Sequence, residues 1–148
     1  MCIQPADDLA AAERIRRGGL RVTSARMLVL RALRESDHPM AAAQVYAEVR
    51  KQGGQIDMVS VYRALSILAA LGLVHHVGSV DGYTACRIEG DHGQGTAHTV
   101  CNSCGAASER NLSPRALDVI WADAEAAMFH AETVRVEVLG LCHSCRPG

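Results

Sequence analysis

Hydrophobic positions in the first half of the chain recur every three to four residues, the spacing of an amphipathic α-helix. This pattern predicts helices over residues 25–34, 41–51 and 58–71, each next to residue types that cap or end a helix. Two short alternating segments follow, 73–77 and 83–87, joined by a turn-rich Gly-Ser-Val-Asp-Gly sequence. Three helices and a hairpin in this order predict a winged helix-turn-helix.

The third predicted helix divides most clearly into two faces. Its apolar side chains are expected to face a core, while serine, tyrosine and arginine fall on the opposite side at about 100° per residue. Such outward side chains are typical of a recognition helix, and a small module that binds another protein is the alternative. The apolar stripe consists of Met58, Val61, Leu65 and Leu68, and the opposite side of Val59, Ser60, Tyr62, Arg63, Ser66 and Ala70.

The second half of the chain predicts a small α/β unit. Short strands over 97–100 and 107–112 flank a Cys-x-x-Cys-Gly turn, a helix over 114–130 begins with proline, and 133–141 alternates as a strand. About 50 residues bury little core on their own, so this unit is expected to need a metal, a partner subunit or both.

The residues between the two halves break the periodicity. The sequence Glu-Gly-Asp-His-Gly-Gln-Gly contains three glycines and no apolar side chain, which is typical of a linker. The chain is therefore expected to have the α+β fold class, with a winged helix-turn-helix domain over residues 1–87, a hinge over 88–95 and a small α/β domain over 96–148.

Charge is distributed unevenly along the 148 residues, although the formal net charge is only -1. Residues 1–87 carry 11 Lys and Arg against 8 Asp and Glu, whereas residues 88–148 carry 4 against 8. Nearly all the basic residues of the first half are arginine, which suits bidentate contacts with phosphate. The first half is therefore expected to bind an anionic partner, the alternative being that its arginines are solvated or paired along helix faces.

Hydrophobic content of 49% and charged content of 21% are those of a globular protein. No apolar run approaches the roughly 18 residues that cross a membrane, and residues 1–8 lack the pattern of a secretory signal. We therefore expect a cytoplasmic protein with no membrane partner, in which the six cysteines stay reduced and serve metal or redox chemistry.

Four of the cysteines form two Cys-x-x-Cys pairs. Cys101 and Cys104 make up the first pair and, after 37 intervening residues, Cys142 and Cys145 make up the second. Two such pairs are typical of a closed tetrahedral zinc site, because each tight turn directs two sulfurs at one ion. A thioredoxin-type redox pair is the alternative, but that motif opens a helix after a strand and does not explain a second copy. The sequence therefore predicts a structural zinc.

Further candidate metal ligands lie around the hinge. His75 and Cys86 fall on the two predicted wing strands, His92 and His98 lie in and just after the hinge, and Glu109 belongs to the strand after the first cysteine pair. Imidazole and thiolate suit zinc better than hard cations, so a second zinc site joining the two halves is a hypothesis. Surface positions for the histidines and the glutamate, and a buried apolar role for Cys86, are the alternatives.

Five short motifs resemble, in order along the chain, the ferric uptake regulator family. They are VTSARMLVL, SVYRAL, GLVHHV, CNSCG and GLCHSC, and the resemblance extends from about Gly19 to Cys145. It implies a homodimeric winged-helix protein, a bacterial transcriptional repressor that binds double-stranded operator DNA when loaded with metal, with dimerisation carried by the second domain. A regulator rather than an enzyme also fits the residues, which form no catalytic constellation.

Within that family the sequence looks most like the zinc uptake regulator branch. The resemblance implies a regulatory zinc held by His75, Cys86, His98 and Glu109, with His92 as the alternative to His98, and hence two zinc ions per chain. An iron- or peroxide-responsive member of the family is the alternative function, which the thiolate of Cys86 disfavours, and a zinc-binding thiol redox protein is a more distant one. The expected DNA contacts are Ser60, Tyr62 and Arg63 on the third helix, with Arg21 and Arg26 near phosphates or a minor groove.

Overall fold

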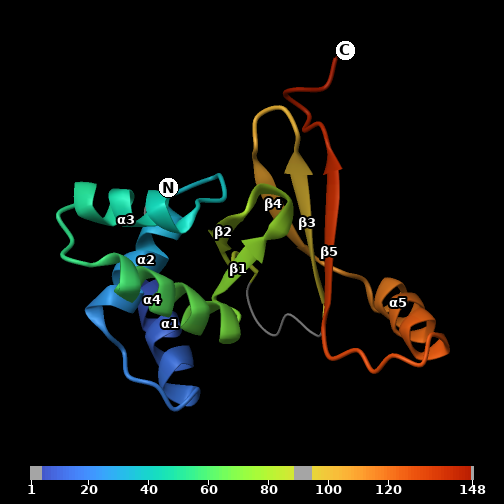
Figure 1. Ribbon diagram of the computed structural model, residues 1–148, viewed down its shortest axis with the longest axis horizontal. Helices are drawn as coiled ribbons and strands as arrows, with labels where there is room; N and C mark the ends of the chain where they lie inside the picture. The colour runs from blue at the N-terminus through green and yellow to red at the C-terminus, as the bar shows by residue number, and fades with distance from the viewer. Residues whose placement is uncertain (1–4, 89–94, 148) are drawn as a thin grey trace. The chain divides into compact units, whose positions relative to one another are not determined.

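The computed structural model describes residues 5–88 and 95–147 (Figure 1). The chain forms two compact units, Met1–Cys86 and Arg87–Gly148. The predicted hinge falls almost wholly on residues 89–94, outside the described part of the chain. No helix within the described ranges combines the length and the hydropathy that crossing a membrane requires.

The first unit packs helices against a two-stranded hairpin around one hydrophobic core. Its elements are α1 (Pro5–Arg17), α2 (Ser24–Arg34), α3 (Ala42–Lys51), α4 (Met58–Ala70), β1 (Val74–Val77), the 3-10 turn η1 (Gly78–Val80) and β2 (Gly82–Ala85). Every helix and β1 contribute fully buried side chains, for example Ile15, Leu30, Val45, Leu65 and Val74. The order from α2 to β2 confirms the predicted winged helix-turn-helix.

Helix α1 has no counterpart among the predicted helices. Its apolar stripe is short, with Ala11 and Ile15 buried four residues apart, and most of its other residues are alanine, arginine or acidic. The carboxylate of Asp8 accepts from both Arg31 (2.6 Å) and Arg34 (3.0 Å) of α2, which holds α1 against the core. The sequence features that indicate this helix are proline at its start, strong helix formers throughout and two glycines after it.

The wing hairpin is attached to the helices by a short strand-like segment before α3. Met40 exchanges two backbone hydrogen bonds with Tyr83 of β2, at 2.9 and 2.8 Å. Close packing here requires glycine at position 82, because a Cβ on Gly82 would lie 2.8 Å from the Cβ of Pro39. The wing is therefore fixed to the helical core of its own unit.

The second unit is a three-stranded sheet with one crossover helix. Its elements are β3 (Gly95–Cys101), β4 (Ala107–Asn111), α5 (Pro114–Ala126) and β5 (Val134–Gly140). The central strand β3 pairs antiparallel with β4 and parallel with β5, and α5 supplies the crossover that a parallel pair needs. Among the described residues of this unit, the buried apolar side chains are only Val100, Cys101 and Val134. The core of this unit is therefore small, which is the observation on which the expected need for a metal or a partner subunit rests.

Helix α5 is four residues shorter than the predicted 114–130. Met128 adopts the left-handed backbone conformation, with φ of 58°. The N–H of Phe129 donates to the carbonyl of Ala124 and that of Met128 to Glu125, both at 2.9 Å, in the pattern that closes many helices. The predicted end is wrong because glycine usually takes the left-handed position and marks it in the sequence, whereas here methionine occupies it.

Replacing Asp57 by alanine is expected to destabilise the first unit. The Asp57 carboxylate accepts from the backbone N–H (2.9 Å) and the hydroxyl (3.0 Å) of Ser60 at the start of α4. These hydrogen bonds, the backbone one foremost, lower the pKa of Asp57 below its ordinary value of 3.8. The stabilisation is therefore present at neutral pH and is lost as the pH falls through the lowered pKa.

Near-ultraviolet circular dichroism of the three tyrosines, all in the first unit, reports this change. At neutral pH the midpoint of thermal unfolding should fall by several degrees in Asp57→Ala, and the gap from the parent should narrow as the pH falls below the ordinary carboxyl pKa of 3.8 and through the lowered pKa of Asp57. Asp57→Asn keeps an oxygen acceptor and should stay close to the parent. An Asp57→Ala protein as stable as the parent at neutral pH would show that this cap contributes nothing.

Candidate metal centre and nucleic-acid interface

The four paired cysteines meet at one end of the three-stranded sheet. Parallel strands β3 and β5 place Cys101 beside Gly140 in the sheet register, so the two Cys-x-x-Cys turns leave the sheet at the same edge. In the first turn Gly105 has a positive φ of 75°, and its N–H donates to the Cys101 carbonyl (2.9 Å). The sulfurs that all lie within 4.8 Å of one another are those of Cys101, Cys104, Cys142 and Cys145.

Hydrogen bonds to sulfur prepare this cluster for a cation. The backbone N–H of Cys104, and then that of Cys142 (N to Sγ 3.3 Å), donate to the sulfur of Cys101 and lower its pKa from 9.0 to about 6. At Cys145 the Ser103 hydroxyl lowers the pKa, but the sulfurs of Cys142, Cys104 and Cys101, together with burial, outweigh it and raise the pKa to about 11. Four thiolates repel one another in so small a volume, so a bound cation would displace the remaining protons.

The donor set and its dimensions fit zinc. Zinc in closed structural sites binds four ligands, with sulfur at about 2.3 Å, and a tetrahedron of that size has edges of about 3.8 Å. The sulfurs of Cys104 and Cys142 lie 3.8 Å apart. This sulfur–sulfur distance therefore matches one edge of a tetrahedral zinc site, and all four sulfurs lie within 4.8 Å of one another.

Two further candidate ligands lie on the wing. His75 of β1 stands opposite Thr84, and the N–H of Cys86, just past β2, donates to the carbonyl of Leu73 (2.9 Å). His75 and Cys86 are thus on adjacent strands, two positions apart, and on the same face of the hairpin. Their ligand atoms lie within 4.8 Å of each other, and both side chains are half-buried. An imidazole and a thiolate this close together can bind the same zinc ion.

The remaining described candidates face each other in the second unit. His98 of β3 pairs with Glu109 of β4, so their side chains share one face of the sheet, and the Glu109 carboxylate accepts from the backbone N–H of Arg87 (3.0 Å). Among the described residues His98 is the sole buried polar or charged side chain. Glu137 of β5 flanks His98 on the other side, a position that only the sheet register reveals. His92 lies outside the described residues.

The predicted division of α4 into two faces is confirmed. Val61, Leu65 and Leu68 are fully buried, whereas Tyr62 and Arg63 are exposed. An open cleft of about 550 Å³ lies between the exposed face of α4 and the start of α2. Its lining residues are Thr23, Ala25 and Arg26 at the start of α2, and Ser60, Tyr62, Arg63, Ala64, Ser66 and Ile67 of α4.

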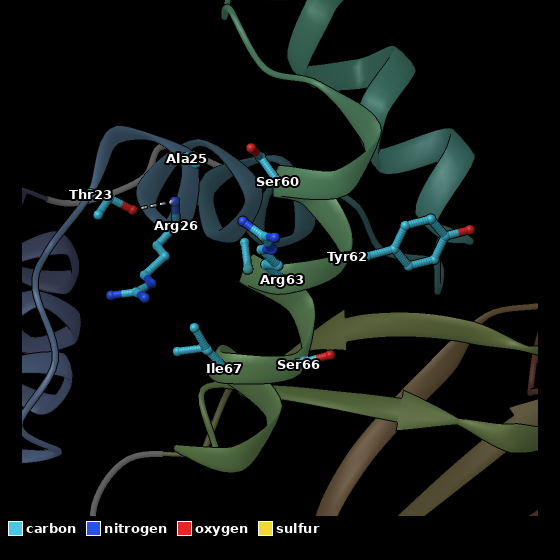
Figure 2. Close-up of a pocket in the computed structure, with 9 residues that line it drawn as sticks. Thr23, Ala25, Arg26, Ser60, Tyr62, Arg63, Ser66 and Ile67 are labelled. Carbon is cyan, nitrogen blue, oxygen red and sulfur yellow. Dashed lines mark hydrogen bonds between the residues drawn. The ribbon is translucent and has the colours of Figure 1, made fainter.

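Four of the five predicted DNA contacts line this cleft. Figure 2 shows Arg26 and Arg63 on the same side of α4, with Tyr62 projecting from the other side. Thr23 caps α2, since its side-chain oxygen accepts from the backbone N–H of Arg26 (3.3 Å). Arg21 is not part of the lining; its side chain is exposed and its carbonyl accepts a hydrogen bond from the Arg26 guanidinium.

Some arginines of the first unit form ion pairs, and others line the cleft. Arg31 and Arg34 are paired with Asp8 of α1, a contact between two helices. Arg17, in contrast, is paired along its own helix with Glu13, as the alternative expected. Arg26 and Arg63 form no ion pair with any residue in the described ranges. Their guanidinium groups and the neighbouring hydroxyls line the cleft without a carboxylate, a composition that suits phosphate oxygens.

Two proteins of known function are similar to this chain in sequence along most of its length. The zinc uptake regulation protein of Escherichia coli (strain K12) is 30% identical over 138 residues, which cover 93% of this chain and 80% of that protein. The zinc uptake regulation protein of Mycobacterium tuberculosis (strain ATCC 25618 / H37Rv) is 30% identical over 131 residues, covering 86% of this chain and 96% of that protein.

Solved structures of similar proteins share the fold along nearly the whole chain. A zinc uptake regulator complexed with zinc and DNA has a TM-score of 0.82 and 27% identity, covering 96% of this chain and 95% of the other. Holo XcZur also has a TM-score of 0.82, with 28% identity, covering 94% of this chain and 96% of the other. The model of the ferric uptake regulator family matches residues 17–138, and the chain therefore belongs to that family.

Proposed function

We propose that this protein is a zinc-responsive transcriptional repressor that binds double-stranded operator DNA in the cytoplasm and controls zinc uptake genes. The observation that carries the proposal is the cleft beside α4, which presents two arginines and several hydroxyls and no carboxylate. Similarity to a zinc uptake regulator complexed with zinc and DNA supports the same function. Such a protein acts by binding and needs no catalytic site.

Helix α4 is the element that we assign to the major groove of DNA. Its exposed face carries the polar and basic side chains, and its buried face anchors it to the core. We assign base-edge and backbone contacts to Tyr62 and Arg63, and Ser60 is assigned to the same DNA-binding face. Arg26 and Arg21, at and before the start of α2, are assigned to phosphates or a minor groove.

A structural zinc is assigned to Cys101, Cys104, Cys142 and Cys145. The second unit buries few apolar side chains in its described part, so a link between the ends of β3 and β5 supplies stability that its core does not. The 3.8 Å separation of two of these sulfurs supports one ion at the cluster.

A regulatory zinc is assigned to His75 and Cys86 of the first unit together with His98 and Glu109 of the second, which gives two ions per chain. Each pair supplies two donors on one face of its own strands, and zinc needs four ligands. The thiolate of Cys86 favours zinc over iron, because zinc is the softer ion in this comparison. Burial of His98 next to Glu109 supports His98 over His92.

A homodimer formed through the second unit completes the proposal. Strand β5 is an edge strand of the sheet, and large apolar side chains of α5, β5 and the residues after them are exposed to solvent. Exposed large apolar side chains and an open strand edge are features that a partner subunit covers. The exposed side chains are Val119, Met128, Phe129, Val138, Leu139 and Leu141.

Zinc held by ligands from both units would couple DNA binding to zinc supply, by fixing the orientation of each winged helix on the dimer. Two α4 helices fit successive major grooves only at a separation of about one helical turn of DNA, roughly 34–36 Å. Residues of the first unit can therefore bind operator DNA tightly only when this separation is favoured.

A zinc titration tests the function. Protein exposed to a mild chelator is expected to keep about one zinc per chain and to leave operator DNA unbound, and about one more zinc per chain should restore binding. The operator is obtained by selection from random-sequence duplexes with zinc-loaded protein. If operator binding does not depend on the zinc concentration, the protein does not sense zinc. If no duplex sequence is selected, the protein is not a sequence-specific repressor.

Cys86→Ser is expected to uncouple zinc sensing from folding. The hydroxyl is a poor replacement for a thiolate ligand, so the variant should remain a folded dimer with its structural zinc yet need at least tenfold more zinc for operator binding. The readout is the midpoint of the zinc titration followed by operator binding. An unchanged midpoint would make Cys86 a packing residue and would exclude it from the regulatory site.

Cys104→Ser is expected to lose the structural zinc, the dimer and thermal stability together, because the cluster would keep three sulfurs and the unit has little core. Zinc content, mass in solution and unfolding temperature measure the three losses. Ser144→Ala changes an exposed residue within the second Cys-x-x-Cys turn and serves as the control. A stable, dimeric Cys104→Ser protein would contradict the structural assignment.

Arg63→Ala is expected to weaken operator binding by about 1–3 kcal/mol while zinc content and dimerisation stay unchanged, because Arg63 points away from the core. The preference for one base over the others should weaken at one position in each half-site of the operator. Arg115→Ala, an exposed residue of α5 with the same loss of charge, is the control. Equal weakening on operator and random DNA would instead make Arg63 a phosphate contact, and no weakening would exclude it from the interface.

A further inference from the structure

Val59 is an exposed apolar residue in the first turn of α4, and none of the contacts assigned above uses it. It is the second residue of the helix and is 58% exposed. Valine is a poor helix former, because branching at Cβ restricts its χ1 angle. Neither core packing nor helix formation therefore accounts for valine at this position.

Viewed down the axis of α4, Val59 lies at the middle of the exposed face of the helix. At about 100° per residue, Val59 lies roughly opposite the buried stripe that contains Val61 and Leu65. Arg63 is displaced by roughly 40° to one side of it, and Tyr62 by roughly 60° to the other. Val59 thus lies between Arg63 and Tyr62, two of the residues that we assign to DNA contacts.

The chemistry of the major groove then limits what Val59 can contact. Residues in the first turns of a recognition helix reach the base edges. A valine side chain neither donates nor accepts a hydrogen bond, and the apolar group that the major groove offers is the C5-methyl of thymine. We propose that Val59 contacts a thymine methyl group and so selects an A·T pair beside the base contacted by Arg63, an inference that rests on the proposed function.

The surroundings of Val59 favour DNA over a protein as the partner of this face. Arg63 and Arg26 contribute positive charge to the neighbouring cleft, and no acidic residue lines it. The carboxylate at the start of the helix, Asp57, has both oxygens engaged by Ser60. The face therefore combines positive charge, which suits the phosphates of DNA, with one apolar side chain, which suits the methyl group of a thymine in the groove between them.

Deoxyuridine substitution in the selected operator tests this contact, because uracil lacks only the methyl group of thymine and keeps its base-pair hydrogen bonds. At one thymine per half-site, the substitution should weaken binding of the zinc-loaded parent about fourfold, the effect of exposing about one buried methyl group. The same substitution should leave the affinity of Val59→Ala unchanged. On the thymine duplex Val59→Ala should itself bind about fourfold or more weakly than the parent.

The variant is suited to this test because alanine forms helices better than valine, so α4 is retained. Leu9→Ala removes an equally exposed apolar side chain from α1, where Leu9 is 71% exposed, and should respond to deoxyuridine as the parent does. Equal losses for the parent and Val59→Ala at every thymine, or no loss for the parent at any, would overturn the inference. If the parent selects no duplex sequence, the proposed function is contradicted as well. If a duplex is selected but deoxyuridine lowers the affinity of the parent and of Val59→Ala equally, only the Val59 contact is contradicted.

Discussion

The parallel pairing of β3 with β5 is the interaction on which the second unit depends. It aligns Cys101 with Gly140 and so brings together two cysteine turns that 37 residues separate in the chain. Because few apolar side chains of this unit are buried, the strand pairing has little core behind it. Sulfurs within 4.8 Å of one another at the end of the pair offer a site where one ion would hold both strands. Sheet register and metal binding therefore support each other.

Strand register also decides how the other candidate ligands are grouped. The hairpin puts His75 and Cys86 on one face, and the β3 and β4 pair puts His98 opposite Glu109. Each unit thus holds two donors, half of what a tetrahedral zinc requires.

Helix α4 packs on the core with one side and presents an exposed face to solvent with the other. Val61, Leu65 and Leu68 fix it to the core, and the exposed side carries polar, basic and apolar groups suited to a DNA groove. The pairing of Arg31 and Arg34 with Asp8 uses other arginines to attach α1, while Arg26 stays at the cleft with Arg63. Two arginines of the first unit therefore hold its helices together, while Arg26 and Arg63 line the cleft.

The sequence by itself determined the features that depend on neighbouring residues. Helical spacing predicted α2 to α4 and the two faces of α4, and the spacing of Cys101, Cys104, Cys142 and Cys145 indicated one tetrahedral site. Tertiary structure decided the features that depend on distant residues. The attachment of α1 through Asp8, the burial of His98 between Glu109 and Glu137, and the choice of which arginines are paired all require contacts across the chain. Local periodicity shows which side of a helix or strand is apolar. Strand pairing and ion pairing depend on residues that are distant in the sequence and that only the folded chain brings together.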